Sequence, residues 1–150
     1  MIKANELRKG NSFFGGAPAR CIGRILTIIQ EGVEAKYQMI GYGAAPNNPG
    51  IGFAKYEDIY PIPLTAEIME KCGFEWRHER YDGETKIWSI NLKNKSRLFL
   101  HFEEDQSDTG YSVSLEDDGN HSFAGHDIFY IHQLQNLYFA LTGEELAVNL

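Results

Sequence analysis

The final quarter of the chain places the strongest constraint on the fold, because its apolar residues recur at helical spacing before a glycine, Gly143. At about 100° per residue, one set of side chains falls within an arc of about 120°, the width of a core-facing stripe. The set comprises Tyr130, Ile131, Leu134, Leu137, Tyr138 and Leu141. The pattern predicts one amphipathic helix within residues 131–146, although Asp127 and His132 are both possible starts.

A second sector of this helix combines polar and aromatic side chains: His132, Gln135, Asn136 and Phe139. An aromatic residue among amides has two interpretations, a second packing face against the N-terminal half or an exposed patch that binds a partner. Both interpretations stay open at the level of the sequence. We take these four residues as the candidate partner-binding residues.

A short helix from Ala66 to Cys72 is predicted by local signals at both ends. Thr65 can cap its first turn with a side-chain hydroxyl. Gly73 supplies a left-handed stop, after which Phe74 can fold back on Met69. All of these signals are local, so the helix is predicted without reference to the rest of the fold.

Residues 1–63 show β-strand patterns separated by turns. Strands are expected near residues 12–14 and over residues 20–29, 33–40 and 53–59. Gly23 indicates a bulge or bend inside the second of these strands. The glycines and prolines of residues 41–52 favour an exposed loop. Together these features predict a small β-barrel. Leu7-x-x-Gly10-Asn11, followed by apolar strands, resembles the opening of SH3-like barrels.

Residues 64–150 are expected to form a second subdomain, because the two prolines of Tyr60–Pro63 hold the backbone extended and mark a boundary. Alternating apolar residues and turn signals predict a meander of four antiparallel strands within residues 74–131. The overall prediction is an α+β fold. It consists of a small SH3-like β-barrel at residues 1–63 and an antiparallel β-meander packed by two helices at residues 64–150.

Four segments carry a family resemblance: residues 1–11, 61–65, 72–75 and 132–146. They lie at both ends and in the centre of the chain. In these segments the sequence resembles a family of small uncharacterised proteins from gut bacteria and their prophages. The resemblance implies a phage or mobile-element context, but it implies no activity, cofactor or catalytic residue.

The sequence contains no motif of known chemistry, since HExxH, GxSxG and a Gly-Lys-Ser/Thr after the Gly-rich loop are all absent. Cys21 and Cys72 are far apart without CxxC spacing, so we expect two buried free thiols. We therefore expect no catalytic residue, no metal and no cofactor, and an enzyme is the least favoured function. The exception would be a pocket that joins distant groups such as His101 and Glu103.

Charge is unevenly distributed along the chain. Residues 1–63 carry seven Lys and Arg against five Asp and Glu, a net +2, whereas residues 64–150 carry seven against sixteen, a net −9, which together give −7. The acidic half disfavours wrapping around nucleic acid. A nucleic-acid interface on the N-terminal half would need its basic side chains on one face. The candidates are Lys3, Arg8, Lys9, Arg20 and Arg24.

No segment approaches the roughly 18 apolar residues of a membrane span, and the N-terminus lacks the apolar run of a signal peptide, so we expect a cytoplasmic protein without membrane contact. The favoured function is a non-catalytic interaction module, an accessory protein of a phage or mobile element that binds a protein partner. Two alternatives remain: nucleic-acid binding through the N-terminal half, and imitation of nucleic acid by the acidic clusters at residues 103–105 and 116–118.

Overall fold

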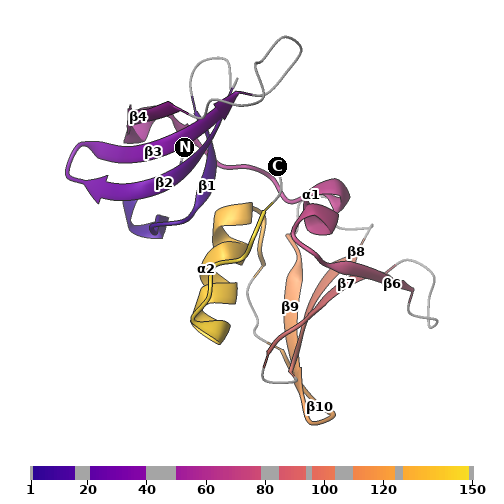
Figure 1. Cartoon of the computed structure of the whole chain (residues 1–150). Helices are drawn as coiled ribbons and strands as arrows, with labels where there is room; N and C mark the ends of the chain where they lie inside the picture. The colour runs from indigo at the N-terminus through magenta and orange to yellow at the C-terminus, as the bar shows by residue number, and fades with distance from the viewer. Residues whose placement is uncertain are drawn as a thin grey trace. The chain divides into compact units, whose positions relative to one another are not determined.

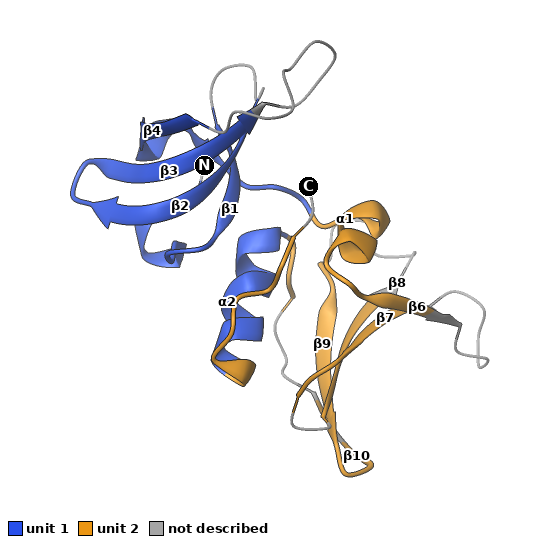
Figure 2. Cartoon of the chain, in the orientation of Figure 1, with its two compact units in different colours: residues 1–63, 130–140 blue, residues 64–129, 141–150 orange. Residues whose placement is uncertain are grey.

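The computed structural model describes residues 2–15, 21–39, 50–78, 85–93, 96–103, 110–123 and 127–148. The fold is α+β, with mostly antiparallel sheets and two α-helices in these stretches. Contacts divide the chain into two compact units (Figure 2), residues 1–63 with 130–140 and residues 64–129 with 141–150. We expected the last helix with residues 64–150, but most of it groups with the first unit.

The first unit contains a five-stranded antiparallel sheet in the order β4-β3-β2-β1-β5. Figure 1 labels β1 to β4 of this sheet. Its strands are β1 (Ser12–Gly15), β2 (Cys21–Ile29), β3 (Gly32–Met39), β4 (Gly50–Lys55) and β5 (Ile59–Tyr60). A 3-10 turn, η1 (Ala4–Glu6), precedes β1, and a second, η2 (Tyr56–Asp58), joins β4 to β5. The strand pairs among the described residues do not close this sheet into a barrel, because β4 and β5 lie at opposite edges.

The predicted boundaries of β4 were wrong at both ends. The strand begins at Gly50, inside the stretch expected to be a loop, and η2 interrupts the strand expected over residues 53–59. The ring of Tyr37 lies against Gly52, and an added Cβ at position 52 would come within 3.3 Å of Tyr37 Cε2. Glycine at this position leaves room for the ring. Glycine here therefore indicates close packing within a strand. Residues 40–49 of the expected loop lie outside the described residues.

Gly23 has a different role from the predicted bulge. The register of β2 against β3 shifts between Ile25 and Thr27, two residues further along the strand. At Gly23 itself, an added Cβ would lie 2.3 Å from Cζ of Phe13, whose side chain is fully buried. Gly23 pairs directly with Phe13 in the β1–β2 ladder, so the missing side chain makes room for the Phe13 ring.

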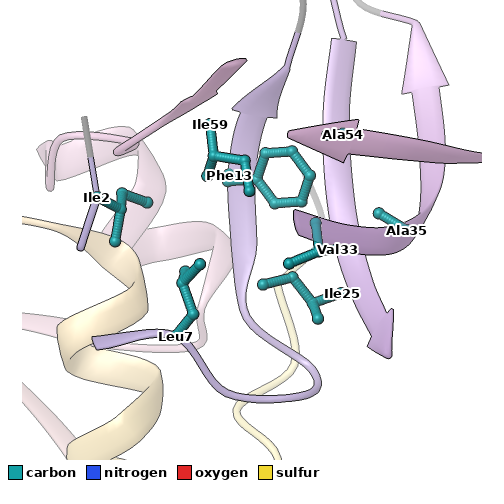
Figure 3. Packing of buried hydrophobic residues seen from close by; sticks show 8 residues of the cluster. All are labelled: Ile2, Leu7, Phe13, Ile25, Val33, Ala35, Ala54 and Ile59. Carbon is teal, nitrogen blue, oxygen red and sulfur yellow. The ribbon is translucent and has the colours of Figure 1, made fainter. Parts of the chain in front are cut away.

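An apolar cluster of described residues forms the core of the first unit (Figure 3). Its members come from the N-terminal segment and from all five strands: Ile2, Leu7, Phe13, Ile25, Val33, Ala35, Ala54 and Ile59. Phe13 lies at its centre and meets the ring of Tyr37 edge-on, with ring centroids 5.9 Å apart. The alternation predicted for β3 is confirmed, because Val33 and Ala35 are buried whereas the residues between and after them are exposed.

The second unit contains α1 (Ala66–Lys71) and a five-stranded antiparallel sheet in the order β10-β9-β8-β7-β6. Its strands are β6 (Glu75–His78), β7 (Thr85–Asn91), β8 (Arg97–Glu103), β9 (Ser112–Asp117) and β10 (Asn120–Phe123). We predicted four strands. The fifth, β10, was missed because it is short and largely polar; Asp118 and Gly119, both with positive φ, form the tight turn that returns it onto β9.

The local signals of α1 are confirmed. The hydroxyl of Thr65 accepts a hydrogen bond from the backbone N–H of Ile68. Gly73 has φ +84°, and the backbone N–H of Phe74 donates to the carbonyl of Met69. These contacts form the left-handed helix stop expected from the sequence.

The second helix, α2, spans Ile131–Thr142. Its first turn is capped by Gln133, whose side-chain Oε1 accepts from the backbone N–H of Tyr130. It ends before Gly143, which has φ +71° as predicted for a stop. Within the predicted apolar stripe, Ile131 and Leu134 are fully buried, and the other four residues are half-buried.

Replacing Gly23 by Ala tests the role assigned to this glycine. The added methyl collides with the Phe13 ring, so we expect the free energy of unfolding to fall by about 1–3 kcal/mol. Chemical denaturation measures the effect. Gly50→Ala is the matched control, because nothing lies within 4 Å of an added Cβ in the same sheet, and its stability should stay within about 0.5 kcal/mol of the wild type. Equal stability of both variants would refute the assignment.

Candidate functional site

The amide of Gln135 joins α2 to the N-terminal segment. Its Oε1 accepts a hydrogen bond of 2.8 Å from the backbone N–H of Ser12. Its Nε2 lies 3.4 Å from both the carbonyl oxygen of Gly10 and the hydroxyl of Ser12. Gln135 is 1% exposed. Because a buried amide without partners is costly, these contacts tie the helix to the start of β1.

Asn136, in the next position of α2, makes three further contacts with the same segment. Its Nδ2 donates to the carbonyl of Glu6 at 2.8 Å. Its Oδ1 accepts from Asn11 Nδ2 at 2.9 Å and from Arg8 Nε at 3.3 Å. The guanidinium of Arg8 also lies 3.8 Å from the ring centroid of Phe139, a cation–π contact. The polar sector of α2 therefore packs against the N-terminal segment.

His132 is the third polar member of this sector and is 1% exposed. Its Nε2 lies 3.6 Å from Oε2 of Glu6, too far for a hydrogen bond, and neither ring nitrogen has a hydrogen-bond partner among the described residues. The imidazole stacks on Tyr130 with ring centroids 5.8 Å apart. Burial lowers the pKa of His132, and the nearby Glu6 carboxylate opposes this effect in part.

The four candidate partner-binding residues thus lie on one face of α2, as the sequence predicted. Three of them, His132, Gln135 and Asn136, are buried or half-buried in contacts within the first unit. Phe139 is partly exposed, and the guanidinium of Arg8 packs on its ring. A role in partner binding stays a prediction, while the observed contacts give this face a structural role.

The five basic residues proposed for nucleic-acid binding have different environments. Lys3 and Lys9 are exposed beside η1 and β1, and Arg24 is exposed on β2. Arg8 is half-buried and engaged by α2. Arg20 lies outside the described residues. Nucleic-acid binding through this set also stays a prediction.

The structure brings together five exposed residues whose proximity was not predicted from the sequence. Across three strands, Arg24 of β2 stands opposite Lys36 of β3, which stands opposite Ile51 of β4. Two residues along, Glu34 stands opposite Phe53 on the same side of the sheet. All five side chains are exposed, and Ile51 and Phe53 retain 67% and 52% of their surface. We call Arg24, Glu34, Lys36, Ile51 and Phe53 the outer face.

The outer face combines two unfavourable features for an isolated sheet. Like charges placed directly opposite on neighbouring strands repel, and neither Arg24 nor Lys36 forms an ion pair within the described part of the chain. Large apolar side chains beside them are left in water. Arg24 was identified from the sequence, but Ile51 was missed because its stretch was expected to be a loop.

Among the described residues, burial disfavours the nucleophilic thiolate form of both cysteines. Burial raises the pKa of Cys72 to about 12. Burial also raises the pKa of Cys21, whose Sγ donates to the carbonyl of Gly15. His101, considered for a distant catalytic pair, lies 2.7 Å from the hydroxyl of Ser114, and the side chain of Glu103 is not described. An open depression beside the end of α1 is lined by Glu70, Lys71, Cys72, Gly73 and Ala147.

Among the described residues, no group of three or more His, Cys, Asp or Glu side chains is placed to hold a metal ion. The helices described in the structure are too short and too polar to cross a membrane. No family model, curated protein or solved structure matches the chain. The resemblance to small prophage proteins therefore stays an expectation.

Asn136→Ala tests the attachment of α2. The variant removes the partner of the Glu6 carbonyl, of Asn11 Nδ2 and of Arg8 Nε. We expect a loss of about 1–3 kcal/mol in the free energy of unfolding, measured in urea. Asn5→Ala, an exposed change in η1 of the same segment, should alter stability by less than about 0.5 kcal/mol. The assignment is contradicted if the two alanine variants unfold at the same denaturant concentration.

Thiol titration tests the state of the cysteines. With a pKa raised to about 12, Cys72 should not react with a disulfide reagent at about pH 8 in the native protein, and Cys21 should react slowly. Both thiols should react rapidly after denaturation. If Cys72 reacts rapidly with the reagent in the native protein, the thiol is not buried as described.

Proposed function

We propose that the protein is a non-catalytic interaction module that binds an acidic segment of a partner protein through the outer face. The observation that carries this proposal is the pair of facing cations, Arg24 and Lys36, next to the exposed side chains of Ile51 and Phe53. A partner carboxylate between the two cations would remove their mutual repulsion. The module fits an accessory protein of a phage or mobile element, as the family resemblance implies.

The first unit supports this proposal as a scaffold. We propose that its sheet is a small SH3-like barrel, in which β1 pairs with both β2 and β5 and a 3-10 turn precedes the last strand. Folds of this class host many functions, so the fold alone does not indicate the function, and the proposal depends on the residues of the outer face. Among the described residues β4 pairs with β3 alone, which leaves its other side for an extended partner segment.

The exposed apolar area and the charges of the outer face favour a partner contact of modest affinity and high specificity. Covering the remaining surface of Ile51 and Phe53 would contribute roughly 1–2 kcal/mol for each side chain. The cations add specificity for acidic partners more than raw affinity. Glu34 on the same face disfavours carboxylates opposite Phe53, so the partner's acidic residues should meet Arg24 and Lys36 and its apolar residues should meet Ile51 and Phe53.

A protein partner is favoured over nucleic acid by the charge of the surface. Phosphate binding depends on several cations gathered together, whereas the outer face offers two with an exposed Glu34 beside them. Imitation of nucleic acid by the second unit also lacks support. In its acidic cluster Glu116 lies 3.9 Å from Arg97, and Asp117 accepts a hydrogen bond from Ser96.

Charge reversal tests the proposed site. A photo-crosslinking residue at position 51 would trap the partner in an extract of the native host, and mass spectrometry would identify the crosslinked segment, which we expect to be acidic. The purified partner should then bind Arg24→Glu/Lys36→Glu at least about tenfold more weakly than the wild type. Lys3→Glu/Lys9→Glu is the matched control, because it carries the same charge change on the same unit in residues outside β2 and β3.

Three outcomes would overturn the proposal. The first is equal loss of affinity in the two charge-reversal variants, which would indicate a general charge effect. The second is a crosslinked segment that is basic or neutral. The third is salt-dependent binding of a labelled single-stranded oligonucleotide that Arg24→Glu/Lys36→Glu abolishes, which would assign the outer face to nucleic acid.

A further inference from the structure

We infer that the attachment of α2 to the N-terminal segment is a pH-sensitive latch, in which protonation of His132 releases the helix. We define the latch as the contacts of His132, Gln135 and Asn136 with residues 6–12. This inference is independent of the proposed function, because it concerns the first unit's internal contacts and not its outer face.

The geometry leaves a protonated His132 poorly compensated. The side chain is 1% exposed, and both ring nitrogens lack hydrogen-bond partners among the described residues. An imidazolium would place two N–H donors and a positive charge in this position. Glu6 lies 3.6 Å from Nε2, whereas Nδ1–H would stay buried without an acceptor among the described residues, which is costly. The neutral ring, in contrast, is held by burial and by stacking on Tyr130.

Among the described residues, the contacts around His132 involve three charged or titratable groups, those of Glu6, Tyr130 and Arg8. From η1, the carboxylate of Glu6 lies 3.6 Å away, but its side chain is 39% exposed, so solvent weakens its attraction. Tyr130 stacks from the residue before α2. Arg8, from the segment that α2 packs against, is directed to Asn136 and Phe139 further along the helix. These groups agree with the lowered pKa of His132, which burial dominates.

The direction of the pH effect follows from this lowered pKa. Released or unfolded His132 binds a proton near its ordinary pKa of about 6.5, whereas latched His132 binds one only at lower pH. The latch is therefore fully stable above about pH 6.5 and weakens as the pH falls below that value. In this window the opening equilibrium constant should increase up to about tenfold for each unit of pH.

The remaining latch contacts would be lost together with His132. Gln135 and Asn136 lie on the same helix face, one turn from His132, and their bonds reach Glu6, Asn11 and Ser12. A rotation or displacement of α2 that hydrates the imidazolium would break these bonds as well. The opening should thus be cooperative over α2 and residues 6–12.

Hydrogen exchange at about pH 7.5 and about pH 5.5 tests the latch, after correction for the intrinsic pH dependence of exchange. We expect α2 amides of the wild type to lose protection by a factor of several, up to about tenfold, at the lower pH, while the β7–β8 ladder of the second unit keeps its protection. His132→Phe should abolish the difference, because the ring stack is kept and no hydrogen bond of His132 is lost. The other four histidines remain in this variant as an internal control.

A second measurement uses the wild type alone, in case the variant does not fold. The Cε1–H resonance of His132 should keep the shift of a neutral imidazole until α2 protection is lost. The inference is overturned if α2 protection is the same at both pH values, if His132→Phe keeps the pH dependence, if α2 and β7–β8 lose protection together, or if His132 titrates near its ordinary pKa while α2 stays protected.

Discussion

Hydrogen bonds from the side-chain amides of one helix face hold the first unit together. Gln135 and Asn136 bond to Ser12 and Glu6, which are 123 and 130 positions away in the sequence. If the backbone N–H of Ser12 stayed buried without the Gln135 oxygen, the free energy of unfolding would fall by about 1–3 kcal/mol. The unit therefore depends on residues from both ends of the chain, which is why its contacts include residues 130–140.

This attachment also bears on the surface that we propose for partner binding. Ser12 begins β1, and its cross-strand partner is Arg24. The same row continues through Lys36 to Ile51. Because the register of an antiparallel sheet sets which side chains share a face, the β2–β3 and β3–β4 pairings align the two cations with the exposed apolar pair. Ser12, which α2 holds, and the outer face thus share one row of paired backbone positions, while the outer face itself is aligned within β2, β3 and β4.

Elements specified by local interactions were predictable from the sequence, and those specified by distant contacts were not. The cap at Thr65 and the stop at Gly73 involve residues within one helical turn, so α1 was predicted correctly. Gly23 was interpreted as a bulge or bend; the bulge lies further along β2, and the ring of Phe13 on another strand occupies the space that a side chain at position 23 would need. The polar sector of α2 was recognised as distinct, but no periodicity could show that its partners are residues 6–12. The residues of the outer face could not be grouped from the sequence, because the register between β3 and β4 decides which of them lie side by side.

The central claim is that the amides of α2 bind the N-terminal segment, and nuclear Overhauser contacts of Gln135 test it most directly. The account predicts cross-peaks from the side-chain amide protons of Gln135 to the backbone amide of Ser12 and to the α-protons of Gly10, with slow exchange of these protons with water. Absence of those cross-peaks, together with rapid exchange of the Gln135 amide protons in the folded protein, would contradict the account.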